Sequence, residues 1–193
     1  MSRVYYDCEF LEDGRTIELI SIGLVTEDGR EYYAVNSGID QWTPDGSEKL
    51  HKRITSHSWL MENVVPHLPL RQPPSRFDGH WLWSLDKSST LVKPSWVIAN
   101  EVRDFLLSVP DRELWAWYGA YDHVALCQLW GRMIDLPKGV PMWTHDLKQE
   151  ADRLGYPELP PMPGATEHNA LDDARELRYR HQWLREQEQE RDA

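Results

Sequence analysis

Two acidic residues, Asp7 and Glu9, interrupt the apolar stretch VYYDCEF near the start of the chain. In a β-strand, residues two positions apart emerge on the same face, so the two carboxylates point the same way. On a half-buried face, ionised carboxylates are costly unless a positive group lies between them. The spacing therefore predicts a cation partner, either an arginine, a lysine or a divalent metal ion. The alternative is a pair of charges that protects an edge strand from aggregation.

A third acid, Asp122, lies within a predicted amphipathic helix over residues 120–131. Three apolar residues follow it at helical spacings: Ala125, Leu126 and Leu129. At about 100° per residue, these positions put Asp122 in the middle of the apolar stripe. We expect its side chain to face inward, although an acid near a helix start can also complement the helix dipole.

A fourth acid, Asp173, belongs to the last predicted helix, from about 168 to 189. The inward face of this helix is marked by Ala170, Ala174, Leu177 and Leu184. With Ala170 set to 0°, Asp173 lies at about 300° around the helix, on the flank of that face. Asp172 lies at about 200°, toward solvent. Of the adjacent pair we therefore choose Asp173. The alternative is that it pairs with Arg178 or Arg180 of its own helix.

His168 precedes this helix in the motif HNALDDA. On one helix it would lie about 140° from Asp173, so it must sit in the preceding turn to reach the same site. The four inward acids have no Arg or Lys at matching positions, and an all-oxygen set favours Mg²⁺ or Mn²⁺ over zinc. Two such ions roughly 4 Å apart stabilise the attacking and leaving oxygens of a phosphodiester displacement. The residues therefore predict a hydrolytic nuclease, with His168 as the general base that deprotonates water.

The composition predicts one globular domain that spans residues 1–193, with 40% apolar residues. The net charge of −11 argues against a broad phosphate-binding surface for long nucleic acids, but allows a short or end-on substrate held through metal ions. Cys8 and Cys127 both lie in apolar patterns, which indicates reduced, buried thiols. We find no apolar leader and no run of about 18 apolar residues, so we expect no signal peptide, no membrane span and a cytoplasmic location.

The first 36 residues predict a three-stranded antiparallel meander. The tetrapeptide EDGR occurs at 12–15 and again at 27–30, and Asp-Gly between strand-like runs is a strong hairpin signal. The predicted strands cover 3–10, 16–26 and 30–36.

Residues 37–93 form an irregular excursion rich in Pro, Gly, Ser and Trp, whose fold the sequence does not give. One helical candidate covers about 47–65. It contains the basic segment HKR at 51–53, which is either a solvated helix face or a phosphate contact.

Beyond residue 93, helices and strands alternate. We expect helices over 95–107, 120–131, 146–155 and 168–189, and short strands over 113–119 and 140–147. The charged end, about 185–193, should be solvated and fray. This order predicts an α/β fold in which a mixed β-sheet, the meander plus parallel strands, is flanked by helices.

Three short motifs resemble those of a known enzyme family: DCE in the first strand, AYD at a helix start, and HNALDDA. They are similar to the motifs of the DEDDh 3′–5′ exonucleases, which have a ribonuclease-H-like fold. More closely, residues 3–36 and 113–131, and less clearly 160–180, resemble the actinobacterial polyadenylate-specific 3′-exoribonucleases, the RNase AS group. The excursion is longer than we expect for that group.

The resemblance implies that Asp7, Glu9, Asp122 and Asp173 bind two Mg²⁺ ions, for which Mn²⁺ can substitute, and that His168 is the base. It further implies cleavage of single-stranded RNA 3′ ends to nucleoside monophosphates, an adenylate preference and a homodimer. The residues expected around the last nucleotide are Cys8, Glu9, Phe10, Leu11, Glu18 and His168. Phe10 or Leu11 would wedge against its base. Cys8 stands where the family usually has Thr and should point away from the metals.

Glu18 interrupts the apolar run IELISIGL, where an unpaired carboxylate is costly. We expect it to accept hydrogen bonds from a sugar, a base or the backbone, and an exocyclic amine of adenine would fit. The alternative is a hydrogen-bonded core acid that contacts no substrate.

Two other functions remain compatible with these residues. One is a related enzyme, either an oligoribonuclease or a DNA-directed exonuclease, since the choice of sugar depends on the geometry around the 2′-OH. The other is a non-catalytic module that binds RNA ends or adenine nucleotides.

Overall fold

The first three strands form the antiparallel meander that the two EDGR turns predict. The computed structural model describes residues 2–40, 49–156 and 158–192. Its meander consists of β1 (Ser2–Glu12), β2 (Ile17–Thr26) and β3 (Glu31–Asn36). The turns contain Gly14 and Gly29, whose φ angles of 79° and 88° are readily adopted only by glycine. The hairpin prediction is therefore confirmed.

Three short parallel strands extend the meander into a six-stranded mixed sheet of order β6-β3-β2-β1-β7-β8. They are β6 (Val92–Lys93), β7 (Arg112–Ala116) and β8 (His145–Asp146). The predicted strand over 113–119 ends early, because the chain turns at Tyr118, where φ is 52°. The strand predicted over 140–147 is reduced to two residues. The α/β class with a mixed sheet flanked by helices is confirmed.

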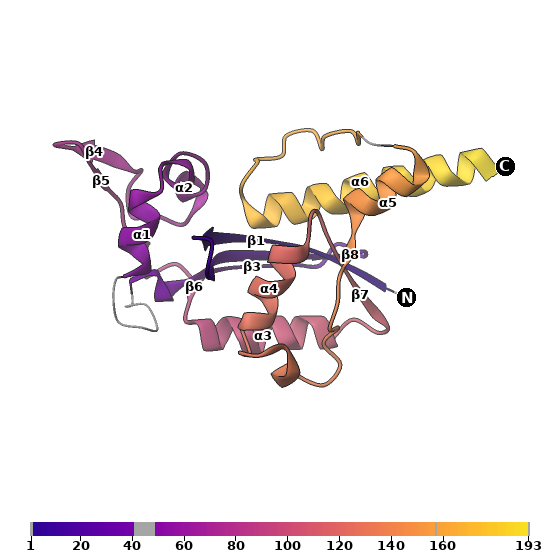
Figure 1. The fold of residues 1–193 in the computed structure, drawn as a ribbon, viewed down its shortest axis with the longest axis horizontal. Helices are drawn as coiled ribbons and strands as arrows, with labels where there is room; N and C mark the ends of the chain where they lie inside the picture. Colours follow the sequence, from indigo (N-terminus) through magenta and orange to yellow (C-terminus); the bar gives the residue numbers. More distant parts are fainter. Residues whose placement is uncertain (1, 41–48, 157, 193) are drawn as a thin grey trace.

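Helices cover both faces of this sheet, as Figure 1 shows. One face carries α3 (Ser95–Leu107) and α4 (Ala120–Gln128), and the other carries α5 (Leu147–Leu154) and α6 (Ala170–Asp192). Alternate residues of β1 enter the two cores: Tyr6 and Cys8 pack with α3 and α4, whereas Tyr5 packs with α6. The alternation that puts Asp7 and Glu9 on one face thus directs both toward α6.

The excursion contains more regular structure than the sequence indicates. The predicted helix over 47–65 is two helices, α1 (Leu50–Ser56) and α2 (Ser58–Asn63), and its first two positions lie outside the described residues. The break falls at His57, because its backbone is extended and its Nδ1 accepts the N–H of Leu60 as a helix cap. A short 3₁₀ helix, η2 (Val65–His67), follows α2, and after it β4 (Ser75–Phe77) and β5 (His80–Leu82) form an antiparallel hairpin.

The excursion packs onto the sheet through a third hydrophobic cluster. Ile54 and Leu60 of the two helices meet Leu11 and Val35 of the meander there. A further 3₁₀ turn, η1 (Ser37–Asp40), leads out of β3. Across the described ranges, the structure contains no helix of the length and apolar composition that crossing a bilayer requires.

Candidate active site

The two acids of β1 lie beneath the start of α6. Asp7 pairs with Gly23 and Glu9 with Ser21 across β1 and β2, and the register shifts immediately after Glu9. Only 8% of Glu9 is exposed. The strand therefore places two carboxylates on a covered face, as their spacing predicts.

Asp122 joins these acids from the first turn of α4. Its Oδ1 accepts the backbone N–H of Cys8 at 2.9 Å, and only 6% of the residue is exposed. Because Cys8 lies between Asp7 and Glu9, this hydrogen bond fixes a third carboxylate beside the first two. The Cys8 thiol belongs to the cluster on the opposite face and points toward the carbonyl oxygen of Asp122, 3.8 Å away.

Asp173 reaches the same place because β2 and α6 approach closely. Gly23 makes the approach possible, since a Cβ at this position would collide with the backbone of Ala170 and Leu171. The helix begins at Ala170, two residues later than predicted, because the Asn169 side chain accepts the N–H of Leu171 at 3.1 Å. The first turn of α6 is therefore pressed against the strand that pairs with Asp7.

His168 lies in the turn before α6 and not on the helix, as the spacing requires. Its φ of 63° is in the left-handed region, which directs the chain back toward the sheet. One ligand atom from each of His168, Glu9 and Asp173 lies within 4.8 Å of the other two. The Trp59 ring of α2 contacts the His168 ring edge-on, with centroids 4.8 Å apart. Sequence patterns gave no indication of this contact.

The four carboxylates repel one another in a poorly solvated place. Burial, reinforced by three neighbouring carboxylates, raises the pKa of Asp7 well above its ordinary value. Burial and then repulsion by Asp173 and Asp122 raise the pKa of Glu9 to about 8. Burial is also the main reason why the pKa of Asp173 rises to about 7 and that of Asp122 to about 6. The protein alone thus disfavours the ionised forms.

No ion pair within the described part of the chain involves any of these four acids. Asp172, next to Asp173, pairs instead with Arg175 at 2.6 Å. Four inward carboxylates without a protein cation, of which Glu9 and Asp173 form the close group with the His168 imidazole, fit the ligand preference of Mg²⁺ or Mn²⁺. The donor set therefore suits hard divalent ions.

A pocket of about 250 Å³ opens at this cluster. Asp7, His168 and Asp173 line it together with Trp117 and Arg180, which sequence reasoning did not select. The guanidinium of Arg180 lies 5.3 Å from the Trp117 ring centroid and 2.7 Å from a carboxylate oxygen of its helix neighbour Glu176. The pocket thus has an acidic floor and one arginine on its wall.

The two apolar candidates for a base wedge differ in exposure. Phe10 is half-buried and stacks on Tyr121 of α4, with ring centroids 6.2 Å apart and an angle of 25° between the planes. Leu11 is only 3% exposed and packs in the third cluster. Of the two side chains, Phe10 therefore offers surface to a ligand. The Cys8 N–H is already used by Asp122, so this residue acts on the site by fixing that carboxylate.

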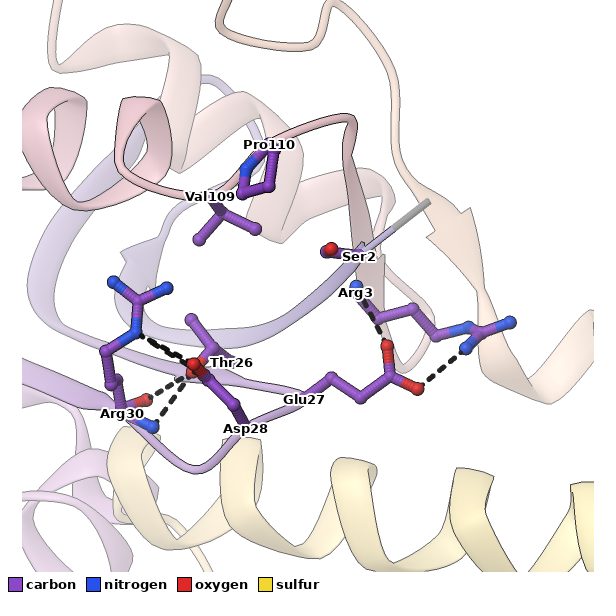
Figure 2. A pocket seen from close by; sticks show the side chains of 8 residues that line it. All are labelled: Ser2, Arg3, Thr26, Glu27, Asp28, Arg30, Val109 and Pro110. Atoms are coloured by element: carbon purple, nitrogen blue, oxygen red, sulfur yellow. Dashed lines mark hydrogen bonds and ion pairs between the residues drawn. The ribbon is translucent and has the colours of Figure 1, made fainter.

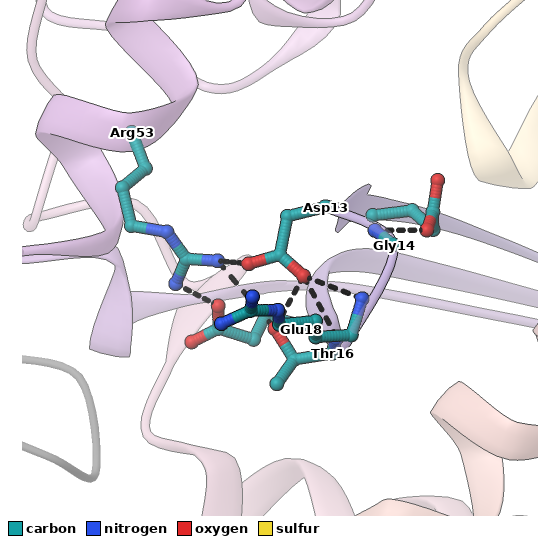
Figure 3. A network of polar contacts seen from close by, with 7 residues as sticks. Asp13, Gly14, Thr16, Glu18 and Arg53 are labelled. Carbon is teal, nitrogen blue, oxygen red and sulfur yellow. Dashed lines mark hydrogen bonds and ion pairs between the residues drawn. The ribbon is translucent and has the colours of Figure 1, made fainter.

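Glu18 has a different partner from the sugar, base or backbone that we predict from the sequence. Figure 3 shows its carboxylate paired with the guanidinium of Arg53 from α1, which also contacts Asp13 Oδ2 at 2.8 Å. Arg53 belongs to the basic segment 51–53, and its side chain is largely covered. Glu18 is thus a paired acid that ties the β1–β2 hairpin to the excursion.

A second, larger pocket of about 380 Å³ lies where β1 begins (Figure 2). Its acids all have cation partners: Glu27 accepts from Arg3 at 2.9 Å and also pairs with Arg185, and Asp28 pairs with Arg30 at 3.2 Å. Acids balanced in this way do not need a metal ion. The contrast singles out the cluster beneath α6.

No protein-family model matches the chain. Two curated relatives, the 3′-5′ exoribonucleases of two strains of Mycobacterium tuberculosis, are each 44% identical over 176 residues, which covers 90% of this chain and 88% of each relative. Among solved structures, S. pombe Pop2p with Mg²⁺ and Mn²⁺ bound aligns over 95% of this chain and 82% of its own, with 15% identity and a TM-score of 0.45. A similarity as distant as the last carries no argument about function.

Proposed function

The chain belongs to the family of these 3′-5′ exoribonucleases, and from this premise we propose that it is a metal-dependent enzyme that shortens single-stranded RNA from the 3′ end. Its products are nucleoside monophosphates, and residues 1–193 form one exonuclease domain. The observation that carries the proposal is the cluster of four inward carboxylates without a cation partner among the described residues. RNA phosphates would be repelled by such a cluster unless cations balance it.

Asp7, Glu9, Asp122 and Asp173 are the residues that would hold two Mg²⁺ ions, with Mn²⁺ as a substitute. When bound, the ions supply the positive charge that stabilises the attacking and leaving oxygens of a phosphodiester displacement. The raised pKa values support this assignment, because carboxylates that are costly to ionise alone become favourable ligands once a cation is present.

His168 takes the proton from the attacking water at a ring nitrogen. The water oxygen bonds to the terminal phosphorus, and the bond from phosphorus to the 3′ oxygen of the preceding nucleotide breaks. That oxygen gains a proton, so the RNA is one nucleotide shorter and ends in a 3′-OH. His168 is half-buried at a pocket wall, which lets it return its proton to solvent.

The adenylate preference rests on the resemblance of residues 3–36 and 113–131 to the RNase AS group. The stacked pair of Phe10 and Tyr121, one from each of these segments, supports it by offering an aromatic surface to the terminal base. Stacking accepts every base, so the preference needs further contacts with the adenine edge.

The homodimer is a separate part of the proposal. Five large apolar side chains between the middle of α4 and β8 are exposed: Val124, Met133, Ile134, Met142 and Trp143. Exposed apolar surface of this kind is typical of interaction sites. We place the contact between two copies of the chain there.

The test follows 5′-labelled RNAs with A-, C-, G- or U-tailed 3′ ends in Mg²⁺, with EDTA as the control. We expect a ladder that shortens from the 3′ end, fastest on the A tail and absent with EDTA. Equal rates on all tails would refute the adenylate preference alone. Cleavage of single-stranded DNA but not RNA would favour the DNA-directed alternative. If the protein cleaved neither RNA nor single-stranded DNA, with Mn²⁺ or with Mg²⁺, the remaining function would be that of a non-catalytic binding module.

A further inference from the structure

The middle of the excursion, residues 49–84, has an excess of positive charge, although residues 37–93 as a whole contain seven Lys and Arg against six Asp and Glu. The net charge of the chain is −11, yet residues 49–84 contain five Lys and Arg against two Asp and Glu, together with four of the eight His. Arg71 and Arg76 flank the start of the β4–β5 hairpin, and both are exposed. Neither forms an ion pair with any residue that the structure describes. Arg71 is close enough to Asp86 to contribute to the lowered pKa of that acid, but neither guanidinium is neutralised by an ion pair within the described ranges, so both can still attract an anionic ligand.

Aromatic rings accompany these charges in a groove of about 460 Å³, which we call the hairpin groove; His51, Arg71, Trp81 and Trp83 line it. The His51 ring stacks on Trp83 with centroids 4.2 Å apart and 15° between the planes. The guanidinium of Arg76 covers the Trp81 ring at 4.3 Å. Alternating rings and guanidinium groups form the kind of surface on which unpaired bases stack while their phosphates are neutralised.

The hairpin adds exposed apolar surface at both of its ends: Phe77 lies next to the turn, and Leu82 lies opposite Ser75 at the open end. Phe77 is 74% exposed and Leu82 is 53% exposed, on two strands of three residues each. Within the pair, Phe77 lies opposite His80 and Arg76 opposite Trp81. Each strand thus combines large rings with a cationic or titratable group.

The hairpin groove is connected to the candidate active site through α1 and α2. His51 of α1 lines the groove, and Trp59 of the next helix contacts His168. Figure 1 shows the hairpin projecting from the same end of the molecule as α2, beyond the start of α6. The ion pairs of Arg53 with Glu18 and Asp13 fix α1 against the meander. The excursion is therefore held at the end of the sheet next to the candidate active site.

We propose that the hairpin groove binds single-stranded RNA upstream of the 3′ end that occupies the active site. The inference rests on the proposed exonuclease function and adds a second contact region to it. Among the described residues, Arg180 is the one arginine that lines the pocket of the candidate active site, so the phosphates of a longer strand must be neutralised elsewhere. The charge and rings of the hairpin groove meet that need, and short RNAs would not reach it.

The test compares kcat/KM for the dinucleotide ApA with kcat/KM for a single-stranded, A-tailed RNA of about 20 nucleotides, both in Mg²⁺. In the double variant Arg71→Gln/Arg76→Gln, we expect kcat/KM for the long RNA, divided by kcat/KM for the dinucleotide, to fall about tenfold. This corresponds to about 1.4 kcal/mol. The dependence of the long-RNA reaction on salt should also become less steep, by a slope of about 0.7 per lost phosphate contact. Arg103→Gln, which removes a charge from α3, is the matched control and should leave both quantities unchanged. If the double variant fails to fold, Phe77→Ser replaces it, with the same fall in the ratio expected.

Three outcomes would overturn the inference. Unchanged ratio and salt slope in a double variant that still hydrolyses RNA would refute the hairpin groove and leave the proposed function intact. A changed oligomeric state with an unchanged ratio would reassign the groove to contact between copies of the chain. If the unmodified protein hydrolyses nothing, the proposed function fails, and fluorescence anisotropy of the same RNA in EDTA still tests the groove. Equal affinity of the protein and its double variant would then refute it.

Discussion

The backbone N–H of Cys8 donates a hydrogen bond to Oδ1 of Asp122 at 2.9 Å, across 114 residues of sequence. This contact joins the strand that carries two of the acids to the helix that carries the third. Asp122 thus has two roles: its side chain accepts a structural hydrogen bond, and it carries a negative charge. Substitutions can separate these roles, because an amide oxygen can accept the same hydrogen bond without carrying charge.

Asp122→Asn should retain the hydrogen bond and lose the charge, so we expect a folded protein whose hydrolysis of A-tailed RNA falls about 100-fold or more. Asp122→Ala leaves a buried N–H without a partner and should cost about 1–3 kcal/mol of unfolding free energy as well. Urea unfolding in EDTA and the RNA ladder measure the two effects. If Asp122→Asn and Asp122→Ala lowered the unfolding free energy equally, the hydrogen bond to Cys8 would not be what stabilises the fold at this position.

The neighbouring acids Asp172 and Asp173 offer a matched pair of substitutions. Asp173→Asn should abolish most hydrolysis, since it removes a metal ligand, by about 100-fold or more. Asp172→Asn loses only an ion pair with Arg175 and should keep activity within a few-fold. Isothermal titration with Mg²⁺ should show weaker binding for Asp173→Asn alone. The reverse order would mean that the wrong acid of the pair has been assigned.

The metal-free protein should lose stability as pH rises from about 4.5, where the unfolded acids release their protons, to about 8, where folded Glu9 does so. Folding raises the pKa of Glu9 to about 8 and that of Asp173 to about 7, so the folded state keeps protons that the unfolded state has released. The free energy of unfolding then falls through this window. In the lower part of this window, from about pH 4 to 6.5, the buried His181, whose pKa burial lowers to about 4, offsets part of the fall, because there the unfolded state binds the additional proton.

Mg²⁺ should therefore raise the melting temperature more at pH 8.5 than at pH 6.5, because it binds the ionised acids. Thermal melts in EDTA and in Mg²⁺ at both pH values measure the difference. Asp172→Asn serves as the control and should behave like the unmodified protein. A Mg²⁺ effect that is independent of pH would contradict the cluster as the metal site.

Gly23→Ala should distort the site from the opposite strand. The new Cβ would meet the backbone of Ala170 and Leu171, so α6 must move away from β2, at a cost of about 1–3 kcal/mol. Gly155→Ala is the control: it strains a left-handed residue by about 1–2 kcal/mol but meets no atom within 4 Å. Both variants should be destabilised, and only Gly23→Ala should also lose hydrolysis and stabilisation by Mg²⁺. If both variants lost hydrolysis and stabilisation by Mg²⁺, the cause would be reduced stability in general and not the displacement of α6 from β2.

Ile134→Asp should convert the proposed homodimer to a monomer, because it puts a charge at an exposed apolar position after α4. Light scattering after size exclusion measures the mass. Trp96→Asp changes a similarly exposed apolar residue on α3 and should leave the dimer intact. A monomeric unmodified protein would refute the dimer directly.

The sequence was informative where chemistry depends on local spacing. The alternation of β1 predicts that Asp7 and Glu9 share a face, and the paired EDGR turns predict the meander. It was uninformative where a contact joins segments that no periodicity relates. Trp59 against His168 and Arg53 against Glu18 both depend on how the excursion packs, and the excursion has no sustained helical or strand period.

Local patterns also misplaced the ends of elements. The predicted helix over 47–65 ran through His57, since nothing in its spacing shows that the side chain caps a second helix. The pattern predicts that the last helix begins at about residue 168, but the left-handed backbone of His168 delays its start to Ala170. In both cases a single residue with a non-helical φ and ψ overrides a pattern that extends over several turns.

The link from Arg53 to Glu18 and Asp13 also determines how this protein could be simplified by engineering. At first sight the excursion is a removable insertion, because it lies between two strands of one sheet. Excising it would leave Glu18 without its counter-ion and would uncover Leu11 and Val35, which are buried beneath it. A minimal nuclease would therefore need these positions redesigned together. The excursion is an integral part of the scaffold that supports β1, the strand with two of the candidate metal-binding acids.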